Sequence, residues 1–443
     1  MGKYVHYYEA TSDYTYARTN NYSEPWVSYT SGNNSVNYNK TDDERRAEIR
    51  TTPLTLEIKT AGTLRWRRSG TTTVQAIQYS KNGAAWTNFT SATTLSVAAN
   101  DTIQLRGSAA TYASESGIGS YHCISGNCQY SARGNIMSLV SGWSSYATAD
   151  VVPTSGYFGS LFRNATGLTD ATNLVLPASN VKPSCYRQMF AGCTNLTGAP
   201  SSLPAEEIAD YCYEGMFSGC TKLATTPTLP ATSLAEYCYA NMFRGATGIT
   251  ATPSLPATEL KSYCYQSMFQ GCTHLTGTPV SLPAITLKDG CYQYMFKGCT
   301  ALVNAPEIDA IDLEFNTNQY FQCEQMFAGC TALVNGPSIL KPSVLVENCY
   351  NAMFSGCTHL TGAPVLPASE ITCWSYYEMF RGCSALNRIE CYATNIPPND
   401  ACEPCINWVA GVASSGTFVK AASMTAWPSG ANGIPANWTV ENA

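Results

Sequence analysis

The sequence predicts a multidomain protein in which an N-terminal all-β sandwich is followed by an α/β repeat solenoid with a C-terminal cap. Two observations support this fold class. A Met-Phe pair recurs at intervals of 26–27 residues, with one interval of 31, and the region before the repeats alternates apolar and polar residues. A unit this short buries its apolar face only against its neighbours, as solenoid units do. The eight pairs begin at Met189, Met216, Met242, Met268, Met295, Met326, Met353 and Met379.

Each repeat is predicted to contain one helix and one extended segment. Ile208, Cys212 and Met216 are spaced four apart, which would place them on one face of a helix. The glycine that follows each Met-Phe pair fits a left-handed helix C-cap. Thr-x-Leu, a proline and usually Leu-Pro-Ala come next, and the proline is expected to start the following helix. The stacked extended segments should form a narrow parallel ladder.

The repeated cysteines are predicted to be core residues. The first cysteine of a unit lies on the predicted helix face, and the second follows the glycine, eight residues later where the frame is regular. Eight helical residues span about 12 Å, whereas a disulfide needs its Cα atoms within about 7 Å. The third unit has Cys238 but Ala246 in the second place, so a small apolar group serves there. We expect reduced, buried thiols. The alternatives are a disulfide ladder and a zinc site, although mixed Cys and His at zinc-ligand spacing do not recur.

The frame Phe-x-Gly-Cys-Thr-x-Leu resembles the BspA-like leucine-rich repeats of bacterial surface proteins. The complete Met-Phe frame with Leu-Pro-Ala-Thr is similar to a variant of gut Bacteroidetes and their phages or prophages. The resemblance covers roughly residues 155–443, implies a leucine-rich-repeat-like solenoid, and is compatible with adhesion, partner binding or virion architecture. The chain departs from the pattern at residues 311–322, where the long interval shifts Cys323 by one place and predicts a bulge or loop. The closing module of the family is matched by residues 407–412, 416–420, 424–427 and 433–435.

Four regions are expected. Residues 1–50 would be an N-terminal arm or attachment segment, 51–148 the β-sandwich, 149–389 the solenoid of about nine units, and 390–443 the capping module. The arm lacks apolar periodicity, which fits a segment that orders on docking; a ragged first part of the sandwich is the alternative.

The β-sandwich is predicted from residues that alternate with a period of two, over about six to eight strands. Asn82-Gly83 indicates a hairpin turn, and Asn100-Asp101 marks another. The apolar residues of the alternation are Leu54, Leu56, Ile58, Leu64, Trp66, Ile77, Tyr79, Leu95, Val97, Ile103 and Leu105.

The ends of the solenoid differ from its middle. Residues 161–168 are a degenerate first unit, as expected where one face lacks a neighbouring repeat. Trp408, Trp427 and Trp438 belong to the predicted C-terminal cap. Two cysteine pairs outside the frame, Cys123/Cys128 and Cys402/Cys405, are left open between disulfides and free thiols.

Composition restricts the function. Charged residues make up 13% of the chain, whereas 28 tyrosines and many Thr, Ser and Asn residues supply a neutral polar surface typical of an exterior protein. A net charge of −6 with 25 Lys and Arg residues disfavours nucleic acid as a partner. The sequence also shows no apolar run of signal-peptide or membrane-spanning length, so we expect neither Sec export nor a membrane span.

We expect no enzymatic activity, no cofactor, no metal and no catalytic residue. Among the four histidines, His274 and His359 occupy a slot that elsewhere holds Asn195, Lys222 or Gly248, which indicates a surface position. Hydrolase, phosphate-loop and zinc-protease motifs are absent from the sequence.

The leading hypothesis is a non-enzymatic structural and binding protein, namely a bacteriophage virion component of the head or tail fibre or decoration type. Its N-terminal region would contact other virion proteins, and a Tyr- and Thr-rich face of the solenoid would contact host-surface glycans or a neighbouring chain. The binding residues are unknown. We expect a homo-oligomer or part of a larger assembly, located in the virion after assembly in the host cytoplasm. A bacterial cell-surface adhesin is the alternative, and a cytosolic scaffold is a third class.

Overall fold

The computed structural model describes residues 50–71, 75–140, 145–315, 321–396, 405–425 and 427–443, together with the backbone of four short strands nearer the N-terminus. Those strands form two antiparallel pairs, β1 (Val5–Glu9) with β2 (Thr15–Thr19) and β3 (Thr30–Ser31) with β4 (Asn34–Ser35). The other residues of the predicted arm up to 49 lie outside the described residues. From residue 52 onward the described residues contain no α-helix, and the fold is essentially all-β.

The first large element is a β region of two antiparallel sheets. One has the strand order β12-β5-β10-β7-β8 and the other β11-β6-β9. The residues of the predicted period-two alternation lie on these strands, except Leu54 directly before β5, and nearly all are buried, with Trp66 fully so. The strands are β5 (Thr55–Ile58), β6 (Gly62–Ser69), β7 (Ile77–Lys81), β8 (Thr87–Phe89), β9 (Thr94–Val97), β10 (Thr102–Arg106), β11 (Tyr121–Gly126) and β12 (Tyr130–Asn135).

The predicted turn at Asn82-Gly83 is confirmed. Both residues have positive φ, 52° and 77°, which is a conformation that Asn and Gly tolerate best. Asn100 also has a positive φ of 71°, and the Asp101 carboxylate accepts hydrogen bonds from the Ala98 amide and the Asn82 side chain.

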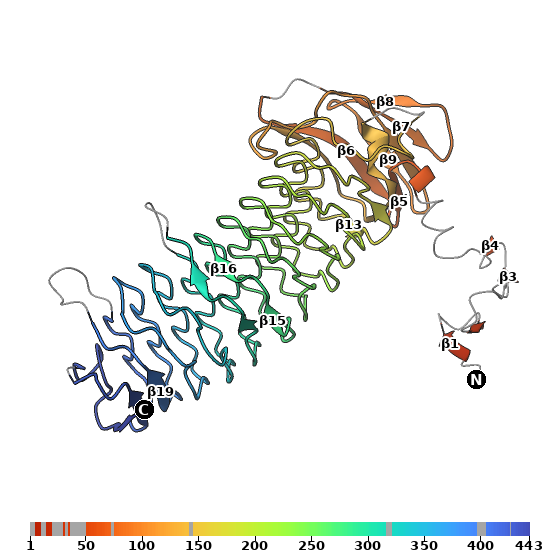
Figure 1. Cartoon of the computed structure of the whole chain (residues 1–443). Helices are drawn as coiled ribbons and strands as arrows, with labels where there is room; N and C mark the ends of the chain where they lie inside the picture. The colour runs from red at the N-terminus through yellow and green to blue at the C-terminus, as the bar shows by residue number, and fades with distance from the viewer. Residues whose placement is uncertain are drawn as a thin grey trace.

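The β region joins the repeats through strand pairing. β12 pairs in parallel with β13 (Leu168–Asp170) and β14 (Leu174–Val175) of the first repeat. The Tyr130 amide donates to the Gly167 carbonyl at 2.9 Å. β12 therefore stands where a preceding repeat would stand. After it comes the short 3-10 helix η1 (Ile136–Leu139). One hydrophobic core runs from Leu54 in the β region to Trp438 near the C-terminus, and the repeats lie in a row between these ends (Figure 1).

The predicted helices of the repeats do not form, so the α/β part of the predicted fold class is wrong. Each Met-Phe segment is a run of turns in which backbone N–H groups alternate between two acceptors. In the first Met-Phe repeat, the Arg187 amide donates to Ser184 three residues back, whereas the Gln188 amide donates to Glu214 in the next repeat, at 2.8 Å. Because every second amide bonds to the following repeat, each repeat is one coil of a continuous stack.

Left-handed residues recur every four positions in these turns. Ser184, Gln188 and Gly192 have φ of 59°, 53° and 75°. The left-handed glycine of each frame was therefore predicted correctly, but it closes a run of turns rather than a helix. Side chains point inward in adjacent pairs, such as Met189 with Phe190, and outward in the pairs between them. This fourfold period explains why the apolar spacing resembled a helix.

The extended segments form the predicted parallel ladder, although their prolines start no helix. Most contacts are single parallel bridges, such as Asn180 with Glu207 and Glu207 with Ser233. Short strands form at the long interval, where β15 (Ser281–Leu282) pairs with β17 (Glu307–Ile308) and β16 (Thr286–Leu287) pairs with β18 (Asp312–Leu313). β18 falls within the predicted bulge at 311–322, of which residues 316–320 lie outside the described residues.

Rings stacked along the axis fill the core. The Phe of each frame is buried and stacks on the Phe of the next coil, with centroids 5.3–5.6 Å apart from Phe162 to Phe380. Burying one such ring contributes about 1.5–3 kcal/mol, and each ring pair adds about 0.5–1.5 kcal/mol. Phe162 shows that the degenerate first unit is a regular coil: its amide donates to Met189 of the next coil at 2.8 Å.

The C-terminal end closes the stack with a parallel sheet and a tryptophan. β19 (Arg388–Cys391), β20 (Thr417–Lys420) and β21 (Thr439–Asn442) form the sheet. The Trp408 ring stacks on Tyr376 at 5.9 Å and lies 6.1 Å from Phe380, so it covers the last coil.

The left-handed glycines allow a matched test of the coil geometry. Gly245 has a φ of 69° and open space around a Cβ, so Gly245→Ala should cost only the conformational strain, about 1 kcal/mol. At Gly290 an added Cβ would lie 2.2 Å from the Tyr263 ring, so Gly290→Ala should lower the urea midpoint clearly more. Equal shifts of the two midpoints would contradict this coil geometry.

Candidate functional site

The outward positions of the turns form a surface that we call the turn face. One line of it, the post-Phe row, contains the residue directly after the frame Phe in every coil. Because neighbouring coils lie about 4.8 Å apart, as hydrogen-bonded strands do, this row places one side chain per coil at a regular spacing. Its members are Arg163, Ala191, Ser218, Arg244, Gln270, Lys297, Ala328, Ser355 and Arg381.

The predicted Tyr- and Thr-rich face is narrower than expected. The tyrosines of the Cys-Tyr dipeptides are buried and stack in the core. The threonine hydroxyls largely bond to the coil before, as Thr276 does to the Thr250 carbonyl at 3.2 Å. The buried tyrosines of these dipeptides are Tyr186, Tyr213, Tyr239, Tyr265, Tyr292 and Tyr350, and Tyr376, which follows Ser375, is buried in the same row.

Tyrosines do stack on the turn face in three consecutive coils. Tyr211, Tyr237 and Tyr263 are half-buried and nearly parallel, with centroids 4.8 and 4.7 Å apart. The Arg187 guanidinium lies 4.8 Å over the first ring. At the other end the Tyr263 hydroxyl donates to Asp289 at 3.0 Å. This surface tyrosine stack is therefore tied to charged groups at both ends.

The second cysteine of each frame makes a contact that the sequence did not reveal. Its thiol donates to the carbonyl of the frame Phe in the preceding coil, as Cys272 does to Phe243 at 3.1 Å. The same contact recurs at Cys193, Cys220, Cys299, Cys330, Cys357 and Cys383. The thiol is thus more than a filler, and Ala246 leaves the Phe217 carbonyl without this donor.

The prediction of reduced thiols holds for almost all described cysteines. The first cysteines of the frame lie close together, with the Sγ atoms of Cys185 and Cys212 3.4 Å apart, but they are free. Cys123, Cys128 and Cys405 are also free, and Cys402 lies outside the described residues. Among the described cysteines, Cys373 alone is disulfide-bonded.

Burial determines the chemistry of these thiols. It raises the pKa of Cys220, Cys272 and Cys330 from 9.0 to about 12. A thiol with this pKa is protonated at neutral pH, whereas the thiolate is the nucleophile and metal ligand. These three cysteines are therefore structural groups.

The variable histidines lie on the surface, as predicted. His274 and His359 are exposed, and the Nδ1 atom of each lies within hydrogen-bond distance of a threonine carbonyl in the preceding coil, at 2.8 and 2.6 Å. Asn195 bonds in the same way to the Thr166 carbonyl. The slot thus accommodates side chains that reach back one coil as well as residues that cannot, such as Gly248.

A hollow of about 360 Å³ opens on the turn face over the first coils. Arg163 and Arg244 stand at its two ends in the post-Phe row, and Ala191 and Ser218 form part of the floor between them. Gly215, which lacks a side chain, deepens the floor. The hollow therefore arises because two consecutive coils carry small residues where the flanking coils carry arginine.

Amide side chains and one carboxylate complete the lining. Asn164, Gln188 and Asn241 contribute the amides. The Glu214 carboxylate forms an ion pair with Arg187, which lies outside the lining. Burial raises the pKa of Glu214, and the Arg187 charge partly opposes that shift. The two terminal arginines thus supply the net charge of the hollow.

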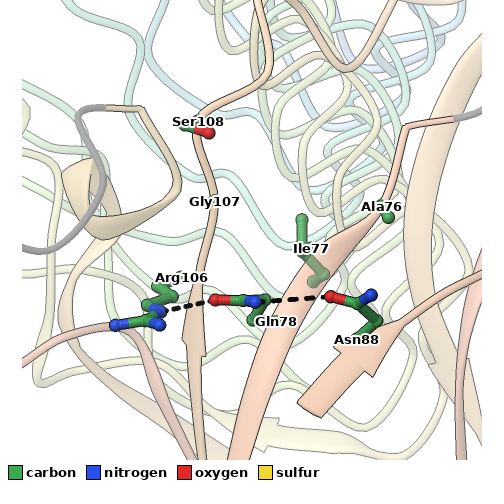
Figure 2. Close-up of a pocket in the computed structure, with 7 residues that line it drawn as sticks. All are labelled: Ala76, Ile77, Gln78, Asn88, Arg106, Gly107 and Ser108. Atoms are coloured by element: carbon green, nitrogen blue, oxygen red, sulfur yellow. Dashed lines mark hydrogen bonds between the residues drawn. The ribbon is translucent and has the colours of Figure 1, made fainter. Parts of the chain in front are cut away.

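A second hollow, of about 380 Å³, lies on the β region. Figure 2 shows Arg106, Gln78 and Asn88 in a row across β10, β7 and β8. Arg106 donates to the Gln78 oxygen at 2.8 Å, Gln78 donates to Asn88 at 3.3 Å, and the Arg106 guanidinium lies 4.3 Å over the Trp86 ring. Because these polar groups bond to one another, the row is largely satisfied within the protein.

Groups suited to a metal ion, with three or more His, Cys, Asp or Glu side chains together, are not found among the residues that the structure describes. In the same part of the chain, none of the helical segments has the length and apolar character needed to cross a lipid bilayer.

Comparison with known proteins gives little further information. No protein-family model matches the chain, and no curated protein matches it either. Among solved structures, the chain is similar to one described as a leucine-rich repeat protein from Bacteroides ovatus, at 16% sequence identity and a TM-score of 0.27. The match covers 64% of this chain and 77% of the other. At this TM-score the likeness supports no conclusion about fold or function.

Restoring the missing thiol tests the role of the cysteine row. Ala246→Cys should stabilise the chain by up to about 1 kcal/mol in reducing buffer, because it supplies a weak S–H donor to the Phe217 carbonyl in a slot that holds cysteine elsewhere. Cys272→Ala, the matched opposite change, should destabilise it by about 1 kcal/mol. Urea unfolding measures both, and a destabilised Ala246→Cys variant would refute the proposed contact.

The raised thiol pKa values predict alkaline unfolding. The unfolded chain releases its thiol protons near pH 9, whereas the folded chain holds them to about pH 12. The stability that the buried thiols contribute is therefore complete below pH 9 and is lost as the pH rises towards 12. The urea midpoint should fall across this window, less steeply for Cys272→Ala. A midpoint that stays level to pH 12 would contradict the burial of protonated thiols.

Proposed function

We propose that this chain is a non-enzymatic structural and binding protein whose coil stack displays side chains at fixed spacing. The supporting observation is the bonding of alternate amides of each coil to the next coil, which orders the turn face of the described coils without a helix. With the backbone held in this way, different residues can occupy an outward slot while the core pattern stays the same.

The proposed setting is the virion of a bacteriophage of gut bacteria, as a head or tail fibre or decoration component. The setting is supported by the repeat frame, whose assignment to BspA-like leucine-rich repeats is part of this proposal. The N-terminal region would attach the chain to other virion proteins, and the turn face would contact the host surface or a neighbouring chain. A cell-surface adhesin is the alternative, because the same repeat frame resembles bacterial surface proteins.

Fractionation of a producing culture tests this setting. An antibody against the chain should detect it in the density-gradient band that contains phage particles, and mass spectrometry of that band should find it beside capsid or tail proteins. Recovery of the chain only with cell envelopes would contradict the virion setting and favour the adhesin.

A further inference from the structure

The post-Phe row contains two stretches with the same pattern of a cation, alanine, serine and arginine. The first is Arg163, Ala191, Ser218 and Arg244, and the second is Lys297, Ala328, Ser355 and Arg381. The two stretches have the same spacing in coils and differ within the row only at the first cation, which is arginine in one and lysine in the other.

The cations of the second stretch are used within the protein. Lys297 donates to the Gln325 side chain at 2.7 Å and lies 4.9 Å over the Tyr294 ring. Arg381 forms an ion pair with Glu378 at 2.8 Å. These two charges therefore offer little to a ligand.

The cations of the first stretch are differently placed. Within the described part of the chain, neither Arg163 nor Arg244 has a carboxylate partner, although Arg163 lies 5.7 Å over the Tyr121 ring. Both line the 360 Å³ hollow. A guanidinium is a bidentate donor suited to carboxylates, so two of them across a small-residue floor favour a ligand with separated negative charges.

We propose that this hollow binds an acidic oligosaccharide, a short chain of carboxylated sugars laid along the solenoid axis. The inference rests on the proposed binding function and adds the site and the ligand class to it. Arg163 and Arg244 are three coils apart, roughly 14 Å. The rise per sugar of an extended pyranose chain is close to the coil spacing, so carboxylates three sugars apart reach both arginines.

The rest of the lining fits a sugar better than a peptide. Asn164, Gln188 and Asn241 present amides that both donate to and accept from hydroxyls. An extended peptide would need a free backbone edge. Here the backbone is committed between coils, because the Gln188 amide bonds to Glu214 and the Gly215 amide to Ala240.

Binding of tetragalacturonate to the purified full chain tests the proposal, with neutral maltotetraose and tetraglutamate as comparison ligands. Tetragalacturonate should bind with a salt-sensitive Kd, and maltotetraose should bind at least tenfold more weakly. Arg163→Ala and Arg244→Ala should each weaken tetragalacturonate about tenfold, as expected for loss of a charge-assisted contact. Arg381 lies in the same post-Phe row, and Arg381→Ala should leave the affinity for tetragalacturonate unchanged.

Filling the floor provides an independent variant. Gly215→Gln should abolish binding while the chain stays folded, because Gln188 has the same left-handed conformation in the neighbouring coil, with a φ of 53°. The proposal would be overturned if tetragalacturonate did not bind, if maltotetraose bound equally well, or if tetraglutamate bound more strongly. It would also be overturned if Arg381→Ala weakened binding as much as Arg244→Ala does. If the arginine variants lose the sugar but the chain is absent from phage particles, the site stands and the virion setting fails.

Discussion

The hydrogen bond that every second turn residue donates to the next coil is the constraint on which this structure depends. Because Gln188 bonds to Glu214, and its equivalents do the same along the stack, adjacent coils are held in one register. That register brings the frame Phe rings into a continuous stack. It also places the second cysteine of a frame against the Phe carbonyl of the preceding coil. It also requires left-handed residues every four positions, which explains the glycine that follows each Met-Phe pair. Core, cysteines and glycines thus follow from one backbone pattern.

The same constraint gives the surface its capacity to differ between coils. An outward slot can hold Ala191 in one coil and Arg244 in another while the inward pairs keep their contacts. The hollow on the turn face is a product of this freedom, since two small residues between two arginines create a concavity with charged ends. The proposed binding function would depend on which residues follow one another in each row along the axis, more than on their order along the chain.

Much of this architecture could be predicted from the sequence. The period-two alternation correctly predicts the strands around Trp66, and the repeat frame correctly predicts the buried cysteines and the parallel ladder. The helix prediction failed because a fourfold turn period and a 3.6-residue helix differ too little over nine residues. Gly215, Gly290 and Asn241 lie inside the predicted helices and are poor helix formers, so they argue against a helix in these segments. The arginine pattern can be found by aligning the coils. Glu378 precedes Arg381 by three residues, so that pairing is local, whereas the lack of a carboxylate beside Arg244 among the described residues depends on neighbouring coils and cannot be read from the sequence.

Far-ultraviolet circular dichroism of the full chain tests the central claim most directly. A stack of turns and short strands predicts a weak spectrum without the helical double minimum, and that spectrum should be lost cooperatively on unfolding. A strong helical double minimum, of the size that one helix in each Met-Phe coil would produce, would show that the amides bond within the coils and would contradict the account given above.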